Sequence, residues 1–328
     1  MTNESASVVM SPVLDGVVNV SKPAGWTSHD VVEKLRRSLG IRKVGHAGTL
    51  DPMATGVLPI LIGKGTRLSE YLVEWDKEYE AVMRLGQDTD TQDATGVVIQ
   101  ERSYAGMTEE SIRTAAAQFL GALQQVPPMY SALKVEGQPL YKLARAGKTV
   151  ERAPRPITIY QLEVLKVEIP DVSFRVTCSK GTYIRTLCAD IGQTLGVGGH
   201  LYQLCRTRVG PFHIEDAVSP LEIDQEFLSH GHNQVVRGLD AVLSHLPEVV
   251  IDSSMVTRAL HGAPIPQSAV SQALGEPCEA GSAQEILRVK DPAGQLLGLG
   301  KFAKETSDSS EIGLPLVFVK VFGNQASL

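Results

Sequence analysis

The sequence of 328 residues contains no apolar run long enough to cross a bilayer, which takes about 20 residues. Its start, Met1 to Pro12, lacks the basic segment that begins a secretory signal. We therefore expect a cytoplasmic protein with no membrane partner. Residues 1–12, which are polar and weakly apolar, are predicted to be a flexible tail.

Cysteine is scarce, and the few cysteines show no paired spacing. No C-x-x-C motif occurs, and each cysteine has mostly apolar neighbours, which favours buried free thiols over a disulfide or a zinc site. His230 and His232 are the only close histidine pair, and no further ligand completes a set around them. We expect no bound metal. The four cysteines are Cys178, Cys188, Cys205 and Cys278.

Four common catalytic signatures are also missing. The sequence has no Walker A motif, no G-x-G-x-x-G after a strand, no H-E-x-x-H and no G-x-S-x-G. These absences disfavour nucleotide-dependent enzymes, metalloenzymes of that type and serine hydrolases. No cofactor is expected.

Positive charge is not in excess overall, but it is unevenly distributed. The net charge is −6, whereas residues 1–210 carry 24 Lys and Arg against 22 Asp and Glu. Residues 134–155 hold six basic residues against two acidic ones, which suits a surface that contacts phosphates, although a solvated charged loop is the alternative. The candidate phosphate contacts are Lys134, Lys142, Arg145, Lys148 and Arg152.

A single carboxylate, Asp51, stands on a glycine-flanked segment from Gly45 to Gly56. Pro52 disfavours helix at Asp51, and the glycines permit positive φ or close backbone approach. The apolar run 57–62 that follows predicts a buried strand. A carboxylate held this way suits a nucleophile or general base, although spacing alone is also typical of an ordinary Asp-Pro turn.

Hydrophobic periodicity predicts both helices and strands. Three helices are expected. The first has Ser28 as its N-cap and ends at Gly40, the second has Thr108 as its N-cap and ends at Gly121 with Leu120 on the apolar face, and the third runs from Thr182 to Gly196. Arg185 lies in the first turn of the third helix, where a cation opposes the helix dipole, so we expect it to have a specific anionic partner. Expected strands span 17–20, 57–62, 77–85, 157–169 and 172–178, with four short ones after residue 247.

Several motifs together resemble the bacterial tRNA pseudouridine-55 synthases. The segment from Gly45 to Pro59 resembles the catalytic signature of that family. Further family motifs are matched, in the same order along the chain, by residues 22–28, 84–91, 127–134 and 178–185. The resemblance runs from about residue 15 to residue 213.

The resemblance implies roles for individual residues. Asp51 is the nucleophile, Arg185 holds its carboxylate ionised and oriented, and Tyr79 stacks on the target base or assists proton removal. Four further residues are implied to contact the substrate, with Lys22 near the site, Tyr183 and Leu204 lining the pocket and His46 touching the RNA loop. The basic stretch within 124–156 is implied to be a flap that contacts the backbone of the tRNA T-arm.

The resemblance also implies an α+β fold. A catalytic domain over residues 13–246, with a mixed and largely antiparallel sheet flanked by helices, contains the 124–156 excursion and precedes a small β-rich, PUA-like domain over 247–328. The implied reaction converts uridine to pseudouridine with no redox step and no net hydrolysis, so it needs no cofactor. Attack at C1′ and attack at C6 both remain open.

Three alternative functions remain. An RNA-guided relative would work within a ribonucleoprotein, but its 124–156 region would be shorter. An RNA-folding protein could carry a vestigial site, and a uracil glycosylase would also use a carboxylate and a flipped base. We expect a stand-alone tRNA enzyme without an obligatory protein partner, and monomer is the default.

Overall fold

The computed structural model describes residues 14–135, 137–230, 232–272, 285–303 and 315–322. The predicted tail, residues 1–12, and Cys278 lie outside this part of the chain. The described residues fall into two compact units, one formed by 18–61 and 68–231 and the other by 14–17, 62–67 and the remainder from 232 onward. The domain boundary expected after residue 246 stays a prediction.

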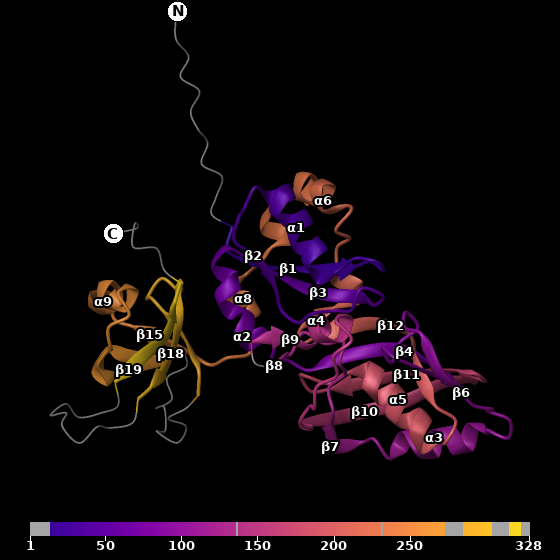
Figure 1. Cartoon of the computed structure of the whole chain (residues 1–328). Coiled ribbons are helices and arrows are strands. Elements are labelled where there is room, and N and C mark those ends of the chain that lie inside the picture. The colour runs from indigo at the N-terminus through magenta and orange to yellow at the C-terminus, as the bar shows by residue number, and fades with distance from the viewer. Residues whose placement is uncertain (1–13, 136, 231, 273–284, 304–314, 323–328) are drawn as a thin grey trace, which may run out of the picture. The chain divides into compact units, whose positions relative to one another are not determined.

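A ten-stranded sheet forms the framework of the catalytic region (Figure 1). Most of its neighbouring strands run antiparallel, but β12 pairs with β3 in parallel, so the sheet is mixed and largely antiparallel as predicted. Strands β2 (Val44–His46) and β13 (Phe212–His213) branch from β3 and β12. The main path is β14 (Arg237–Gly238), β1 (Gly16–Lys22), β3 (Thr55–Ile62), β12 (Gly199–Val209), β4 (Lys77–Leu85), β11 (Asp171–Cys178), β10 (Arg155–Glu168) and β7 (Gly121–Gln125).

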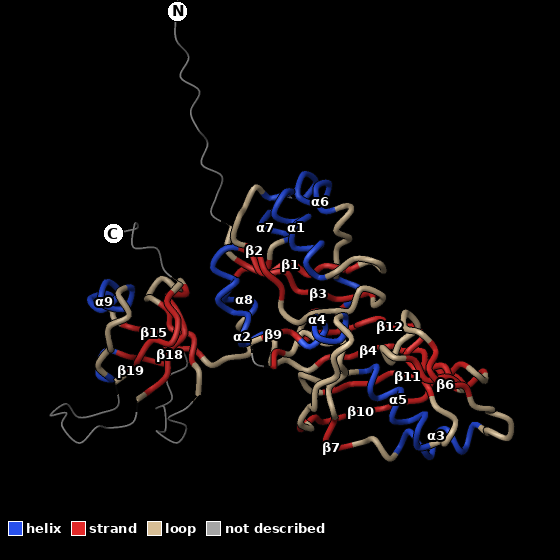
Figure 2. Tube along the Cα trace, in the orientation of Figure 1, coloured by secondary structure: helices blue, strands red, loops and turns tan. Residues whose placement is uncertain are grey.

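Helices flank this sheet, in agreement with the α+β prediction. Helix α3 contacts β10, α5 contacts β12, and α1 lies beside β2 and α6 (Figure 2). The helices are α1 (Ser28–Leu39), α2 (Ser69–Leu72), α3 (Glu109–Ala117), α4 (Leu140–Arg145), α5 (Ile184–Thr194), α6 (Ile223–His230), α7 (His232–Val235), α8 (Leu239–Val242) and α9 (Val256–Leu260). The short 3₁₀ helices are η1 (Gly63–Leu68), η2 (Ile214–Asp216), η3 (Ser253–Met255) and η4 (Gln267–Ala269).

The start of α1 differs by one residue from the prediction. Thr27, not Ser28, caps the helix, and it forms a reciprocal capping box with Asp30. The hydroxyl of Ser28 turns instead to Leu50, accepting from its amide at 2.9 Å and donating to its carbonyl at 3.2 Å. Ser28 therefore ties α1 to the segment that carries Asp51.

The predicted second helix is shorter than expected. Helix α3 ends at Ala117, and Leu120 lies outside it with 47% of its surface exposed. Ile112, Ala115 and Ala116 are the buried residues of this helix. The predicted helix is about one turn longer than α3, because Gly121 begins the edge strand β7 and does not end the helix.

The central strand β12 was not predicted. Its pairing with β4 shifts register between Leu201 and Gln203 and again between Arg206 and Arg208. Each shift interrupts the alternation of inward and outward side chains, which is the pattern that identifies a half-buried strand in a sequence. Polar residues such as Gln203 and Arg206 further mask its central position in the sheet.

Two small hairpins accompany the main sheet. Strand β5 (Gln87–Thr89) pairs with β6 (Val98–Glu101), and within the 124–156 excursion β8 (Lys134–Val135) pairs with β9 (Gln138–Pro139). Helix α4 follows β9 directly. The excursion therefore contains a short hairpin and one helix, with loops before and after them.

The C-terminal residues form a β-rich unit, as predicted. Its sheet runs β16 (Val270–Gln272), β15 (Glu248–Ile251), β17 (Leu287–Lys290), β18 (Leu296–Phe302) and β19 (Leu316–Val321). An antiparallel bridge from Ile265 to Leu316 joins the segment leading into β16 to the opposite edge. The sheet therefore approaches a barrel around a core that includes Val249, Val289 and Leu297.

Candidate active site

Asp51 lies in the connection between β2 and β3, and its backbone is held from several sides. Pro52 lends its carbonyl to the amide of Gly25 at 2.8 Å, and the amide of Ala54 bonds the Asp51 carbonyl at 3.1 Å. Leu50 is buried and bonded to Ser28 as described above. The loop is therefore fixed on both sides of the carboxylate, which suits a group that must be placed accurately.

Gly56 permits the close approach of this loop to β12. Its φ is 103°, and a Cβ at this position would lie 2.2 Å from the carbonyl oxygen of Arg206. Any other residue would break the parallel pairing of Gly56 with Arg206. The glycine at the end of the motif is thus required by sheet pairing.

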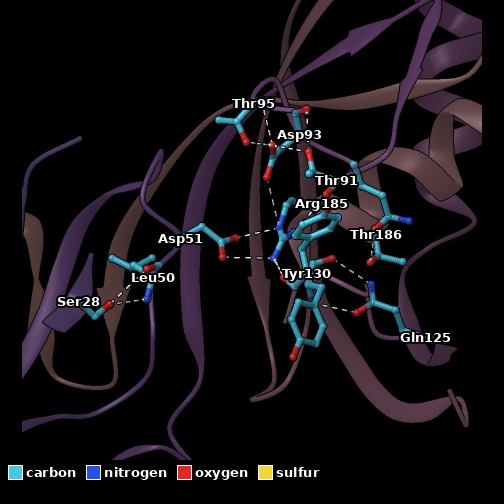
Figure 3. Close-up of polar contacts among 12 residues, drawn as sticks. Ser28, Leu50, Asp51, Thr91, Asp93, Thr95, Gln125, Tyr130, Arg185 and Thr186 are labelled. Carbon is cyan, nitrogen blue, oxygen red and sulfur yellow. Dashed lines mark hydrogen bonds and ion pairs between the residues drawn. The ribbon is translucent and has the colours of Figure 1, made fainter. Parts of the chain in front are cut away.

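Arg185 forms an ion pair with Asp51, as Figure 3 shows. Its Nε lies 2.8 Å from Asp51 Oδ2, and its Nη2 donates to Oδ1 at 3.2 Å. The Arg185 side chain is only 4% exposed, whereas that of Asp51 is 34% exposed. The carboxylate is therefore accessible to a substrate while the cation that orients it is shielded.

Arg185 is held in turn by two carbonyl groups. Its Nη1 donates to the carbonyl of Thr91 at 3.1 Å and its Nη2 to that of Tyr130 at 2.8 Å. Tyr130 belongs to the 124–156 excursion. The unfavourable position of this cation in the first turn of α5 is thus offset by one carboxylate and two carbonyl acceptors.

A second carboxylate, Asp93, lies on the other side of Arg185, with 3.8 Å between Asp93 Oδ2 and Arg185 Nε (Figure 3). Asp93 is buried and accepts hydrogen bonds from the hydroxyl of Thr91 at 2.7 Å and from that of Thr95 at 2.6 Å. The sequence analysis missed this residue. Its signal was the dense Thr and Asp stretch over 88–95, where side chains often bond the nearby backbone.

The pKa of Asp51 is raised above its ordinary value of 3.8, chiefly because the site is desolvated. Arg185 and Lys22 oppose this rise, and the negative charge of Asp93 adds to it. The expectation that Arg185 pairs with Asp51 agrees with the geometry. The effect of Arg185, which favours the ionised form of Asp51, is smaller than the opposing effect of burial.

Tyr79 and Leu204 lie on neighbouring strands, β4 and β12, and both are 8% exposed. Burial raises the pKa of the Tyr79 hydroxyl, and the nearby charge of Arg206 opposes that rise. Tyr79 lies opposite Arg206 in the sheet, and Arg206 lies opposite Gly56 at the end of the Asp51 loop. Sheet pairing thus connects Tyr79 to the Asp51 loop through β12, the strand of Leu204, and the roles of both residues toward a substrate remain predictions.

Tyr183 immediately precedes α5 and is held by Gln125 of β7. The Gln125 amide accepts from the Tyr183 backbone N–H at 2.8 Å and donates to its carbonyl at 3.1 Å. This two-bond contact fixes the chain one residue before the helix that carries Arg185. Gln125 is a further residue that the sequence analysis missed.

His46 ends β2, near the start of the Asp51 loop. Burial lowers the pKa of its imidazole, and the charge of Arg206 acts in the same direction. A neutral ring is thus favoured at neutral pH. Its predicted contact with RNA remains a prediction.

Lys22 is buried, which does not fit the expected contact with substrate. Its ammonium donates to the carbonyls of Pro23 at 2.9 Å, Trp26 at 2.6 Å and Pro52 at 3.2 Å. All three ammonium protons are therefore engaged by the backbone. Burial lowers the pKa of Lys22 to about 8. Its position supports the loop after Asp51, and no side-chain donor is left for RNA.

The basic residues of the excursion lie mostly on its surface. Lys134, Lys142, Arg145 and Lys148 are exposed, and none of them forms an ion pair with another residue of the described part of the chain. Arg145 lies over the ring of Tyr141, 5.6 Å from its centre. Arg152 differs, because it is partly buried and donates to the carbonyl of Pro127 at 3.2 Å. Arg152 therefore helps to fold the excursion.

Two kinds of feature are absent from the described residues. No helix there is long and apolar enough to span a membrane. No group of three or more His, Cys, Asp or Glu side chains in that part of the chain could hold a metal ion. Cys178 and Cys188 are buried free thiols, and burial raises the pKa of Cys178 to about 12.

Comparison with known proteins places these features in one family. Residues 36–184 match the TruB family pseudouridylate synthase N-terminal domain, and residues 185–250 match the tRNA pseudouridylate synthase B C-terminal domain. A tRNA pseudouridine synthase B from Aromatoleum aromaticum is 45% identical over 289 residues, covering 88% of this chain and 89% of the relative. The chain belongs to the TruB family. A relative of the same name from Burkholderia pseudomallei is 46% identical over 88% of this chain and 93% of its own length.

Solved structures related to this TruB family member agree with the fold. A Cbf5–Nop10–Gar1 complex includes a chain that is 30% identical, with a TM-score of 0.71, covering 96% of this chain and 87% of that one. An H/ACA ribonucleoprotein bound to a substrate RNA containing 2′-deoxyuridine gives 27% identity and a TM-score of 0.70 over 97% of this chain and 92% of that one. The predicted pseudouridine synthase fold is confirmed.

Proposed function

We propose that this protein is a tRNA pseudouridine synthase that isomerises uridine 55 in the T-loop of tRNA. The observation that carries the proposal is the ion pair of Asp51 and Arg185, with an accessible carboxylate and a shielded guanidinium, on the loop that matches the family signature. The tRNA pseudouridine synthase B relatives support the same substrate class.

The reaction requires one carboxylate and a rotated base. The N1–C1′ bond breaks, the uracil turns, C5 bonds to C1′, and the C5 proton is lost while N1 gains one. Asp51 acts as the nucleophile, at C1′ or at C6. The product is an isomer of the substrate, with no net oxidation, reduction or hydrolysis, so the reaction calls for no cofactor.

The uridine must leave the RNA stack before Asp51 can reach it. Extrusion costs a few kcal/mol, and stacking on aromatic side chains and contacts to the RNA backbone offset this cost. Tyr79, which is connected to the Asp51 loop through Arg206, is suited to meet the flipped base, with Tyr183 and Leu204 as further lining residues and His46 at the RNA loop. The exposed cations of the excursion are suited to hold the T-arm phosphates.

The enzyme acts in the cytoplasm as a stand-alone monomer in this proposal. The folded 124–156 excursion supplies a basic surface of its own, which favours direct tRNA binding over delivery by a guide RNA. The purified chain should therefore modify tRNA with no added protein or RNA.

The test measures tritium release from tRNA labelled at uridine C5. Wild type should release one equivalent of label from tRNA, and tRNA with cytidine at position 55 should release none from that site. Asp51→Asn should release no label, while Asp224→Asn, which changes an exposed aspartate paired with Lys34, should behave as wild type. Robust release by the Asp51→Asn protein would refute the nucleophile, and release of free uracil would instead indicate a glycosylase.

A further inference from the structure

Arg206 is a buried cation that is bonded to two backbone carbonyls and to the hydroxyl of Tyr79. The side chain is 1% exposed and lies in β12, beneath the Asp51 loop. Its Nε donates to the carbonyl of Val57 at 2.8 Å and its Nη2 to that of Gly48 at 3.0 Å. Within the described residues no carboxylate forms an ion pair with it. Burying a cation without a counter-ion is costly, so two well-placed carbonyls must compensate.

The two carbonyls bracket Asp51 along the chain. Gly48 lies before the carboxylate and Val57 after it, so one guanidinium joins both ends of the loop. The planar fork of arginine donates to the two acceptors from two separate nitrogen atoms at fixed directions, whereas a lysine has a single nitrogen. The Arg206 side chain therefore connects the two ends of the Asp51 loop, and these two hydrogen bonds together form a brace.

The backbone of Arg206 makes two further connections to the site. In the sheet it lies opposite Gly56 on one side and opposite Tyr79 on the other. Its side chain also hydrogen-bonds the hydroxyl of Tyr79, and its charge opposes the rise in the pKa of that hydroxyl. One residue thus joins the Asp51 loop, the strand of Tyr79 and the strand of Leu204.

We propose that Arg206 is a positioning residue for the isomerisation, fixing Asp51 relative to Tyr79 by bridging Gly48 and Val57. This inference rests on the proposed function, because it concerns the same site. Asp51 must approach a single carbon of the flipped nucleotide, and a displacement of about 1 Å costs roughly 100-fold in rate. Arg206 has no contact with RNA in this proposal, so its loss should slow the reaction without weakening tRNA binding.

The experiment compares Arg206→Met, Arg206→Lys and a matched control, Arg208→Met. Arg208 lies on the same strand, and its Nη1 donates only at 3.3 Å to the nearby Gly210 carbonyl. For each protein we would measure single-turnover tritium release at saturating tRNA, the Kd for tRNA and the amide hydrogen exchange of residues 48–57 in the free protein. Circular dichroism checks folding.

Arg206→Met should lower the single-turnover rate about 100-fold, leave the Kd within about threefold of wild type, and speed exchange in residues 48–57. Arg206→Lys keeps the charge but replaces Nε and Nη2 with a single nitrogen, so it should recover only about tenfold of the lost rate. Arg208→Met should match wild type in rate and exchange.

Three results would overturn the brace. These are a rate within about threefold of wild type in folded Arg206→Met, a loss confined to the Kd, or unchanged exchange in residues 48–57. If Arg206→Met does not fold, Arg206→Lys decides, and a wild-type rate in that variant refutes the proposal. A wild-type protein that releases no tritium refutes the proposed function instead, and the exchange measurement still tests the brace.

Discussion

The region around Asp51 and the 124–156 excursion both use cations, but in opposite ways. Around Asp51 the cations Lys22, Arg185 and Arg206 are buried, and each has named acceptors within 3.2 Å. On the excursion, Lys134 and Lys148 are exposed, and among the described residues no carboxylate pairs with either.

The difference separates two functions of positive charge. A buried cation with fixed acceptors cannot reorganise, so it sets the geometry and electrostatics of a reacting group before substrate arrives. An exposed cation keeps its freedom and exchanges its counter-ions for phosphates when RNA binds. The first kind should therefore govern rate, and the second should govern affinity and its dependence on salt.

The largest expected effect comes from the cation that touches Asp51. Arg185→Met should lower the single-turnover rate about 1,000-fold with little change in the Kd for tRNA, because it removes the orienting partner of the carboxylate. Arg175→Met, which breaks an exposed Arg–Glu pair with Glu80 at 2.7 Å, is the control and should keep the wild-type rate. An equal loss in affinity and rate would erase the distinction between the two regions.

Changes to the excursion should affect salt dependence instead. Replacing Lys142, Arg145 and Lys148 together with Gln removes up to three phosphate contacts, so the fall in affinity between about 50 and 200 mM salt should shrink by roughly 40-fold. The rate at saturating tRNA should not change. Filter binding across this salt range tests it.

A second triple variant controls for net charge. Lys34, Lys166 and Lys180 are equally cationic, but their ammonium groups already pair with Asp224, Glu168 and Glu74. Replacing these three with Gln should leave the salt slope nearly unchanged. A slope equal to that of the excursion triple would mean that only total charge matters.

Lys22 should affect stability in a pH-dependent way. Its pKa is lowered from 10.5 to about 8 in the folded protein, so between these values the unfolded chain binds more protons and stability rises with pH. Lys22→Met cannot show this rise. The gap in unfolding free energy between wild type and Lys22→Met should therefore widen by about 1–2 kcal/mol from pH 7.5 to pH 9.5. Urea denaturation at both pH values measures it, and Lys43→Met, at an exposed lysine, should show a constant gap.

The smallest expected effect is on the acid limb of the rate profile. The pKa of Asp51 lies above 3.8 because of burial, so activity should fall with decreasing pH at a pH higher than for an ordinary aspartate. Lys22 is the weakest of the charges that lower this pKa, so Lys22→Met should raise the limb by less than about one pH unit. Single-turnover rates from pH 4 to pH 7 would show it, and a downward shift would contradict the assigned influence of Lys22.

The sequence was most informative where periodicity or a motif persisted along the chain. Strand β4 spans Lys77–Leu85 as predicted, because its side chains alternate without interruption. The motif match predicted that Asp51 and Arg185 form a pair, although they are 134 positions apart in sequence. Local sequence patterns could not have predicted this contact, because Asp51 lies on the loop between β2 and β3 and Arg185 lies on α5.

Other residues of the site escaped prediction for physical reasons. Arg206 lies on a strand whose two register shifts hide its alternation, and a buried arginine bonded to carbonyls has no sequence signature. Asp93 looked like one more acid in a polar turn. Lys22 was predicted near the substrate from the resemblance. Its burial and its three carbonyl partners are properties of the folded chain, and the sequence could not reveal them.

The composition of the second unit limits how this protein can be dissected. That unit includes residues 62–67 as well as the C-terminal sheet, and Lys64 and Arg67 donate to the carbonyls of Phe322 and Val321. Gly16 and Val17 likewise pair with Gly238 and Arg237. A single cut after residue 231 would therefore strand two short N-terminal pieces without their partners. Exchanging this unit between family members would have to transplant three separate segments at once.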